Sequence, residues 1–89
     1  MPQAVVDPEE VRQFARGLKK FTAELRDRLT VLNNRLTALG ETWRDQEHSR
    51  FKGQFEDHTK NLVRFLEAND QHVRYLLRKA DQIDQYLQF

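Results

Sequence analysis

The side chains most able to carry chemistry in this chain are three histidines, His48, His58 and His72, and a single serine, Ser49. Two ligands on one helix share a face when they lie three or four residues apart. Among the histidines, only His48 has such a neighbour, Asp45. A metal centre in a helical bundle needs several inward carboxylates and two such pairs. We therefore predict no metal site, and we expect the three histidines at solvated or interface-rim positions.

Catalytic and cofactor-binding patterns are missing from the sequence as well. There is no cysteine, no glycine-rich phosphate loop and no serine flanked by glycines. The formal net charge is +1 without a basic run, whereas a nucleic-acid-binding protein usually carries a clear basic excess. No uncharged apolar run approaches the length of a membrane span. The sequence predicts a protein that is not an enzyme, takes no cofactor, binds no nucleic acid and does not insert into a membrane.

The elements that must position these residues are two long periodic segments. The first predicts a helix of about residues 8–39, since Asp7 can cap it, Pro8 suits its first position and Glu10 can complete a capping box. Its apolar residues recur at gaps of three or four and form one narrow stripe. The stripe consists of Val11, Phe14, Leu18, Phe21, Leu25, Leu29, Leu32, Leu36 and Leu39.

A turn at about residues 40–44 separates this helix from a second one at about 45–87. Gly40 can end the first helix in the left-handed conformation, and Thr42 or Asp45 can cap the second. The second stripe is wider and contains Phe51, Phe55, His58, Leu62, Phe65, Leu66, Asn69, Val73, Leu76, Leu77, Ala80, Ile83 and Leu87. A connection this short predicts that the two helices fold back antiparallel in a single domain spanning residues 1–89.

A lone hairpin has too many large apolar residues for its one seam. Chains below about 100 residues often need staples or oligomerisation, and with no cysteine the second is favoured. We therefore predict an all-α hairpin that dimerises into a four-helix bundle. The residues expected in the core or the dimer interface are Phe14, Leu18, Phe21, Leu25, Leu32, Phe55, Leu62, Phe65, Asn69 and Leu76.

Two polar residues fall on the second stripe. Asn69 is expected either to be a hydrogen-bonded amide of the helix interface or to fix register or partner choice, as one buried Asn can in coiled coils. His58 could act in the same way, or make dimer stability depend on pH.

The turn carries the one distinctive motif. Trp43 stands between the two helices, the aromatic Phe51 follows eight residues later, and Phe55 lies one helical turn further. This arrangement resembles the WXG family of early-secreted-antigen-like proteins. The resemblance implies a helical hairpin of about a hundred residues that forms dimeric four-helix bundles and travels through type VII secretion systems without a cleaved signal peptide. Trp43 would cap the open end of the core, and would also be able to contact a partner.

Two departures from the family pattern leave the function open. The family glycine is Asp45 here, so that the tripeptide reads WRD, although Asp is itself a good helix cap. The tail signal Tyr-x-x-x-Asp/Glu is also missing, because Lys79 stands four places after Tyr75 and Tyr86 lies too close to residue 89.

Two functions therefore stay open. In the first, the chain is made in the cytoplasm and is a type VII substrate, escort or component, as a homodimer or a heterodimer with a related hairpin. In the second, it is an intracellular adaptor or toxin-associated chaperone of the same fold. A membrane-surface binder is disfavoured because the polar faces have no basic bias.

Overall fold

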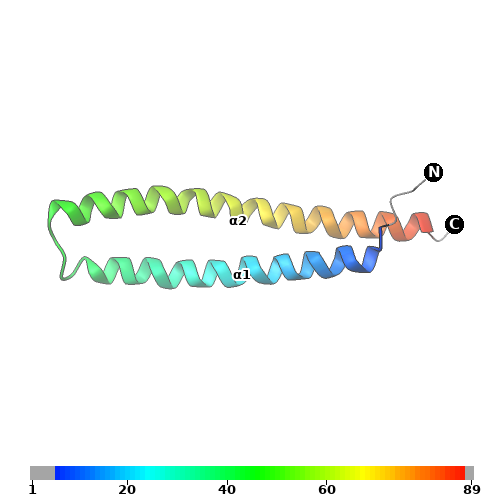
Figure 1. Cartoon of the computed structure of the whole chain (residues 1–89), viewed down its shortest axis with the longest axis horizontal. Coiled ribbons are helices and arrows are strands. Elements are labelled where there is room, and N and C mark those ends of the chain that lie inside the picture. Colours follow the sequence, from blue (N-terminus) through cyan, green and yellow to red (C-terminus); the bar gives the residue numbers. More distant parts are fainter. Residues whose placement is uncertain (1–5, 88–89) are drawn as a thin grey trace.

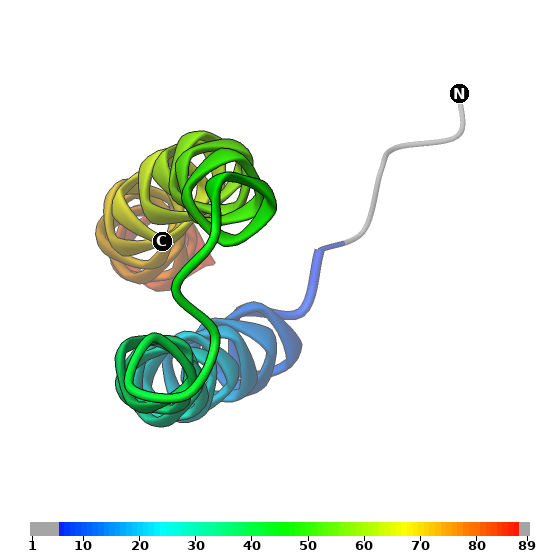
Figure 2. The same ribbon diagram turned by 90° about the vertical axis from the view of Figure 1, so that its left-hand side faces the viewer.

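The fold is an antiparallel hairpin of two long helices. The computed structural model describes residues 6–87, in which α1 spans Pro8–Leu39 and α2 spans Gln46–Leu87. The two helices run side by side and are joined at one end by a short turn (Figure 1). The view along the axis shows the turn crossing from one helix to the other (Figure 2). The predicted all-α hairpin is confirmed.

Local hydrogen bonds explain where α1 begins. The Oδ1 of Asp7 accepts a hydrogen bond from the backbone N–H of Glu9 at 2.9 Å, and Pro8 occupies the first position, where a missing N–H costs nothing. Among the described residues, Glu10 does not complete the expected capping box, because the bond runs from Glu9 and no reciprocal bond forms. The cap alone is enough to start the helix.

The hairpin is a rod rather than a globule. Its extents are 67 × 22 × 17 Å and its radius of gyration is 20.1 Å, where a compact domain of this length would have about 12 Å. The helix α2 has 42 residues against 32 in α1, and it extends past α1 at both ends (Figure 1). A rod of two helices leaves most of each helix surface without a protein neighbour.

The seam between the helices is narrow and consists mainly of small or polar residues. Its buried members are Ala15, Thr22, Leu66, Asn69, Val73 and Ala80, with His48 at the turn end. Several are seven residues apart, which is the spacing of helices that cross at a shallow angle. The sequence stripe did not include Ala15 or Thr22. Small side chains bring the two backbones close together, and this shifts the seam away from the bulkiest residues of the stripe.

Ion pairs between the helices fix their register. Arg12 bonds Glu9 at 2.9 Å, Asp81 at 2.8 Å and also Asp84. Further along, Arg26 bonds Asp70 at 2.6 Å. The pKa of Arg12 is raised, first by the Asp81 carboxylate and then by Asp84. Water screens ion pairs at the surface, so that they add little net stability, and their main effect is to align the helices.

Candidate functional site

The two sides of the hairpin differ in chemistry. Arg12 of α1 pairs with Asp81 of α2, and Arg26 pairs with Asp70. The sides of the two helices that carry these residues therefore lie on one side of the molecule, which we call the ion-pair face. At about 100° per residue, Phe14, Phe21, Leu32 and Leu39 lie within about 20° of one another, on the flank of α1 opposite those arginines. Phe65 and Leu76 lie on the corresponding flank of α2. We call this second side the apolar face; it comprises Phe14, Leu18, Phe21, Leu25, Leu32, Leu36, Leu39, Phe65 and Leu76.

The apolar face is open in the single hairpin. Phe14 is 64% exposed, and Phe21 and Phe65 are both 49% exposed. Two shallow depressions cross this face between the helices. One is lined by Val6, Asp7, Glu10, Val11, Phe14 and Leu76, and the other by Leu32, Arg35, Leu36, Leu39 and Phe55. The depressions show that apolar side chains from both helices meet on one surface. Such a surface is typical of a site for protein association.

Gly40 ends α1 for a different reason from the one predicted. Its φ of −64° and ψ of −14° are right-handed helical values, so the expected left-handed cap is wrong. A Cβ placed on Gly40 would lie 3.2 Å from Cε1 of His48 and 3.3 Å from the carbonyl oxygen of Thr37. The glycine therefore makes room for the His48 ring.

His48 is the residue at the turn that the sequence misplaced. It is 8% exposed, so the prediction of a solvated or rim position is wrong for this histidine, while His58 and His72 are exposed as expected. Its ring meets Trp43 edge-on, with centroids 5.0 Å apart. Its Nε2 is buried without a hydrogen-bond partner among the described residues. The sequence held one sign of this burial, namely a glycine at position 40 and the ring of His48 five residues after Trp43.

Asp45 starts α2. Its Oδ1 accepts a hydrogen bond from the backbone N–H of His48 at 3.0 Å, which settles the choice between Thr42 and Asp45 as the cap. The same bond is the main reason why the pKa of Asp45 is lowered; the Trp43 indole and the Glu47 backbone add smaller effects. Asp45 is thus the cap of α2, and the hydrogen bond that makes it the cap also stabilises its carboxylate charge.

Aromatic rings continue from the turn along α2. The Trp43 and Phe51 centroids lie 6.2 Å apart, and those of Phe51 and Phe55 lie 5.9 Å apart. These spacings fall in the range of favourable aromatic pairs, each worth about 0.5–1.5 kcal/mol beyond its buried area. Trp43 and Phe55 are half-buried and Phe51 is 43% exposed. The aromatic cluster, Trp43, His48, Phe51 and Phe55, therefore closes the turn end and leaves ring surface open to a partner.

The predicted packing residues fall into three groups. Asn69 is buried in the seam, and its Nδ2 has no hydrogen-bond partner within residues 6–87. A hydrogen-bonded amide at the helix interface stays a prediction. Half-buried residues along the edge of the seam are Leu18, Leu25, Phe55, Leu62 and Leu76. The exposed ones are Phe14, Phe21, Leu32 and Phe65. Their place in a dimer interface stays a prediction.

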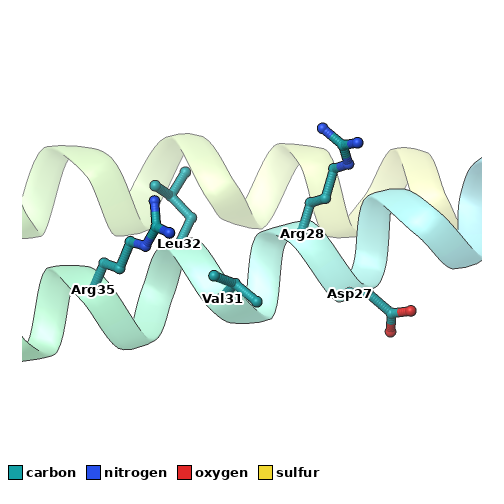
Figure 3. A pocket seen from close by; sticks show the side chains of 5 residues that line it. All are labelled: Asp27, Arg28, Val31, Leu32 and Arg35. Carbon is teal, nitrogen blue, oxygen red and sulfur yellow. The ribbon is translucent and has the colours of Figure 1, made fainter.

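One further depression lies on a single helix. It is lined by Asp27, Arg28, Val31, Leu32 and Arg35 of α1, whose charged side chains spread apart along the helix surface (Figure 3). A surface of this shape gives no enclosure for a reacting molecule. Within residues 6–87, no three His, Cys, Asp or Glu side chains gather as a metal-binding group, and no helix is both long and apolar enough to cross a membrane.

Comparison with known protein families shows which family the chain belongs to. A family model described as WXG100, proteins of 100 residues with WXG, matches residues 3–86. The chain belongs to the WXG100 family. Neither the comparison with curated proteins nor that with solved structures gives a match. WXG100 membership makes the chain a small helical protein associated with type VII secretion, a system whose WXG100 substrates leave the cell without a cleaved signal peptide. The matched residues 3–86 include the turn that carries Trp43 and Asp45.

Proposed function

We propose that this chain acts as a dimer, through protein contacts and without catalysis, as a substrate or escort of a type VII secretion system. The observation that carries the proposal is the open apolar face on a chain of the WXG100 family. In this proposal residues 1–89 are one hairpin domain, and two hairpins pack face to face into a four-helix bundle.

The surface area of the hairpin supports the dimer. The chain exposes 7605 Å², which is about 2,000 Å² more than a compact monomer of its mass would expose. If two hairpins each covered about 2,000 Å² of accessible surface by pairing, the dimer would bury about 4,000 Å² in total, which is within the range of obligate dimers. Part of the exposed surface is apolar, since Phe14, Phe21, Leu32 and Phe65 are all exposed on the face that a second hairpin would cover.

The aromatic cluster supports a second contact, at the turn. Trp43 is half-buried against His48 and Phe51, which holds the indole in one place while part of it stays accessible. A fixed, partly exposed aromatic ring is the usual kind of anchor in protein interfaces, because little conformational entropy is lost on binding. In this proposal Trp43 both closes the hairpin and contacts a component of the secretion system.

The second candidate is an intracellular adaptor or toxin-associated chaperone of the same fold. The absence of a Tyr-x-x-x-Asp/Glu sequence after Tyr75 favours it, since Lys79 stands at the acidic position. In the first proposal, export depends on a signal that a partner carries. The two candidates differ in where the protein accumulates.

The test is an export assay in a host that carries a type VII system. Epitope-tagged chain, with its neighbouring genes, should accumulate in the medium of the parent strain and stay in cells that lack the secretion ATPase. Phe21→Asp should abolish export, while Val31→Asp should not, because Val31 is equally exposed, at 50%, but lies on the outer surface of α1. Retention of the wild-type chain in the cells of both strains would contradict the export proposal and favour the adaptor.

A further inference from the structure

The outward side of α2, opposite the seam, carries a separate line of side chains. At about 100° per residue, the residues on this side recur every three or four positions along the helix. We call this line the outer stripe of α2; it runs from Arg50 to Tyr86 and includes Gly53, Arg64, Tyr75 and Arg78. All six are exposed. The apolar face lies about 100° away around α2, so a second hairpin on that face would leave the outer stripe open.

The outer stripe is basic. Arg50, Arg64 and Arg78 follow one another every fourteen residues, which is about 21 Å along the axis. Within residues 6–87, none of these three arginines has an ion-pair partner. The acid on the stripe is Asp57, whose Oδ1 lies 3.7 Å from Nζ of Lys60. On the outward side of α1, by contrast, acidic and basic residues are mixed. The excess of positive charge is therefore a property of the outward side of α2.

Two tyrosines lie on the same stripe. Tyr75 is 53% exposed and Tyr86 is 80% exposed. Tyr and Arg are among the residue types that most often anchor protein interfaces, because each combines a large contact area with a hydrogen-bonding group. The stripe has no Leu, Ile, Val, Phe or Met, whereas a helix that lies on a membrane buries such residues. Its composition therefore fits a protein surface and not a lipid surface.

Gly53 lies on the stripe without a packing role in the hairpin. Gly is less stable than Ala inside a helix, and a Cβ added at Gly53 would meet no atom within 4 Å. Gly40 differs, since the His48 ring occupies the space beside it. A helix surface without a Cβ allows another backbone to come close. Gly53 is thus suited to contact with a partner near the turn end of the stripe.

The charge and the shape of the stripe define the partner. A guanidinium group pairs with two oxygens of a carboxylate or a phosphate. Glu56 and Glu67 are exposed and flank the stripe on the side of the ion-pair face. A nucleic-acid duplex is wider than a helix and would be repelled by these two carboxylates. A single helix laid along α2 (Figure 1) contacts a line of residues spaced three or four apart. An acidic helix therefore fits both features.

We propose that the outer stripe of α2 is a second docking surface, which binds an acidic helix of another protein laid along α2. The proposal goes beyond the proposed function, because the stripe lies outside the apolar face that a second hairpin would cover. The carboxylates of the partner pair with Arg50, Arg64 and Arg78, and its backbone comes closest to α2 at Gly53. The chain can therefore hold this partner and a second hairpin at the same time.

The experiment titrates the full chain with a synthetic helix and follows binding by calorimetry. The probe has about 35 residues, which matches the length of the stripe, and carries one line of glutamates spaced three or four apart. It should bind with a Kd in the micromolar range at low ionic strength and more weakly as salt is added, because the paired charges are exposed. The same peptide with lysines in place of the glutamates should not bind.

Variants locate the binding on the stripe. Arg64→Glu should weaken binding of the acidic probe about tenfold, since it replaces an attraction by a repulsion. Lys20→Glu, on the exposed outward side of α1, is the matched control and should have little effect. Gly53→Ala and Gly17→Ala should each raise the thermal midpoint by several degrees, because neither new Cβ meets an atom within 4 Å. Only Gly53→Ala should also weaken binding of the probe.

Each outcome supports or overturns the proposal. Equal loss of binding in Arg64→Glu and Lys20→Glu, or no loss in either, would overturn the stripe as the docking surface. Binding of duplex DNA or of anionic lipid vesicles by a chain that does not bind the acidic probe would overturn the class of partner. No binding of any of these probes would overturn the proposal as a whole. A wild-type chain that sediments as a monomer and still binds the acidic probe would contradict the dimer of the proposed function and leave the docking surface standing.

Discussion

The contact between Gly40 and His48 predicts that Gly40→Ala changes the free energy of unfolding in opposite directions with and without the His48 ring. In the wild-type protein, Gly40→Ala would place a Cβ 3.2 Å from Cε1 of His48. Carbon atoms prefer about 3.5–4.0 Å, so the ring would have to move by a few tenths of an ångström. The ring is buried and packed against Trp43, which limits that movement.

The magnitude follows from two opposing effects. Overpacking a well-filled site typically costs about 1–3 kcal/mol, and so small a displacement should cost an amount near the lower limit. The φ and ψ of Gly40, −64° and −14°, suit alanine, and a compatible Gly→Ala change stabilises by about 0.4–1 kcal/mol. In the wild type, the cost of about 1 kcal/mol less this gain leaves Gly40→Ala neutral to destabilising by about 0.6 kcal/mol. With His48→Ala, which removes the ring, the same change should stabilise by about 0.5 kcal/mol.

A double-mutant cycle measures the coupling. Urea unfolding followed by circular dichroism, at one fixed protein concentration, gives the free energy of unfolding of wild type, Gly40→Ala, His48→Ala and the double variant. The contact with the Thr37 carbonyl is present in both backgrounds and cancels. We expect a coupling of about 1 kcal/mol. Equal effects of Gly40→Ala in both backgrounds would refute the role of Gly40 as space for the ring.

Further predictions concern the turn. Trp43→Ala should lower the free energy of unfolding by about 2 kcal/mol, less than the 3–5 kcal/mol of a fully buried aromatic, because the indole is half-buried. Trp43→Phe should keep the thermal midpoint within a few degrees yet weaken partner binding, measured by calorimetry. The folded-state pKa of Asp45 is lowered, so its stabilisation is complete above about pH 4 and is lost as pH falls through that pKa. Asp45→Asn should keep the cap but flatten the acid limb of a stability–pH curve, and Asp45→Gly should cost only a few tenths of a kcal/mol.

Periodicity in the sequence was sufficient to predict the hairpin. A stripe with gaps of three or four over two long segments has no stable alternative as a strand, and Asp7 with Pro8 marks a helix start through local bonds alone. The orientation of each stripe could not be read in the same way. Ala15 and Thr22 lie in the seam because small residues allow the two backbones to approach closely. Which small residues do this depends on how the two helices pack against each other, and the sequence of one helix does not show it.

The sequence predicted the aromatic motif at the turn, but it did not predict how the side chains of the turn pack. Trp43 and Phe51 were identified because their spacing of eight is distinctive. His48 was missed, since a histidine among charged neighbours is usually solvated. Its burial depends on the missing Cβ of Gly40, on a different element, and that contact exists only once the turn has closed.

Sedimentation of the purified chain tests the central claim most directly, namely that the apolar face is covered by a second hairpin. At micromolar concentration the wild-type protein and Val31→Asp should both sediment as helical dimers, while Phe21→Asp and Phe65→Asp, on the apolar face, should shift to monomers. Tyr75→Asp is the matched control on α2, since Tyr75 is 53% exposed and lies on its outer surface. A wild-type protein that is a well-folded monomer at these concentrations would contradict the account.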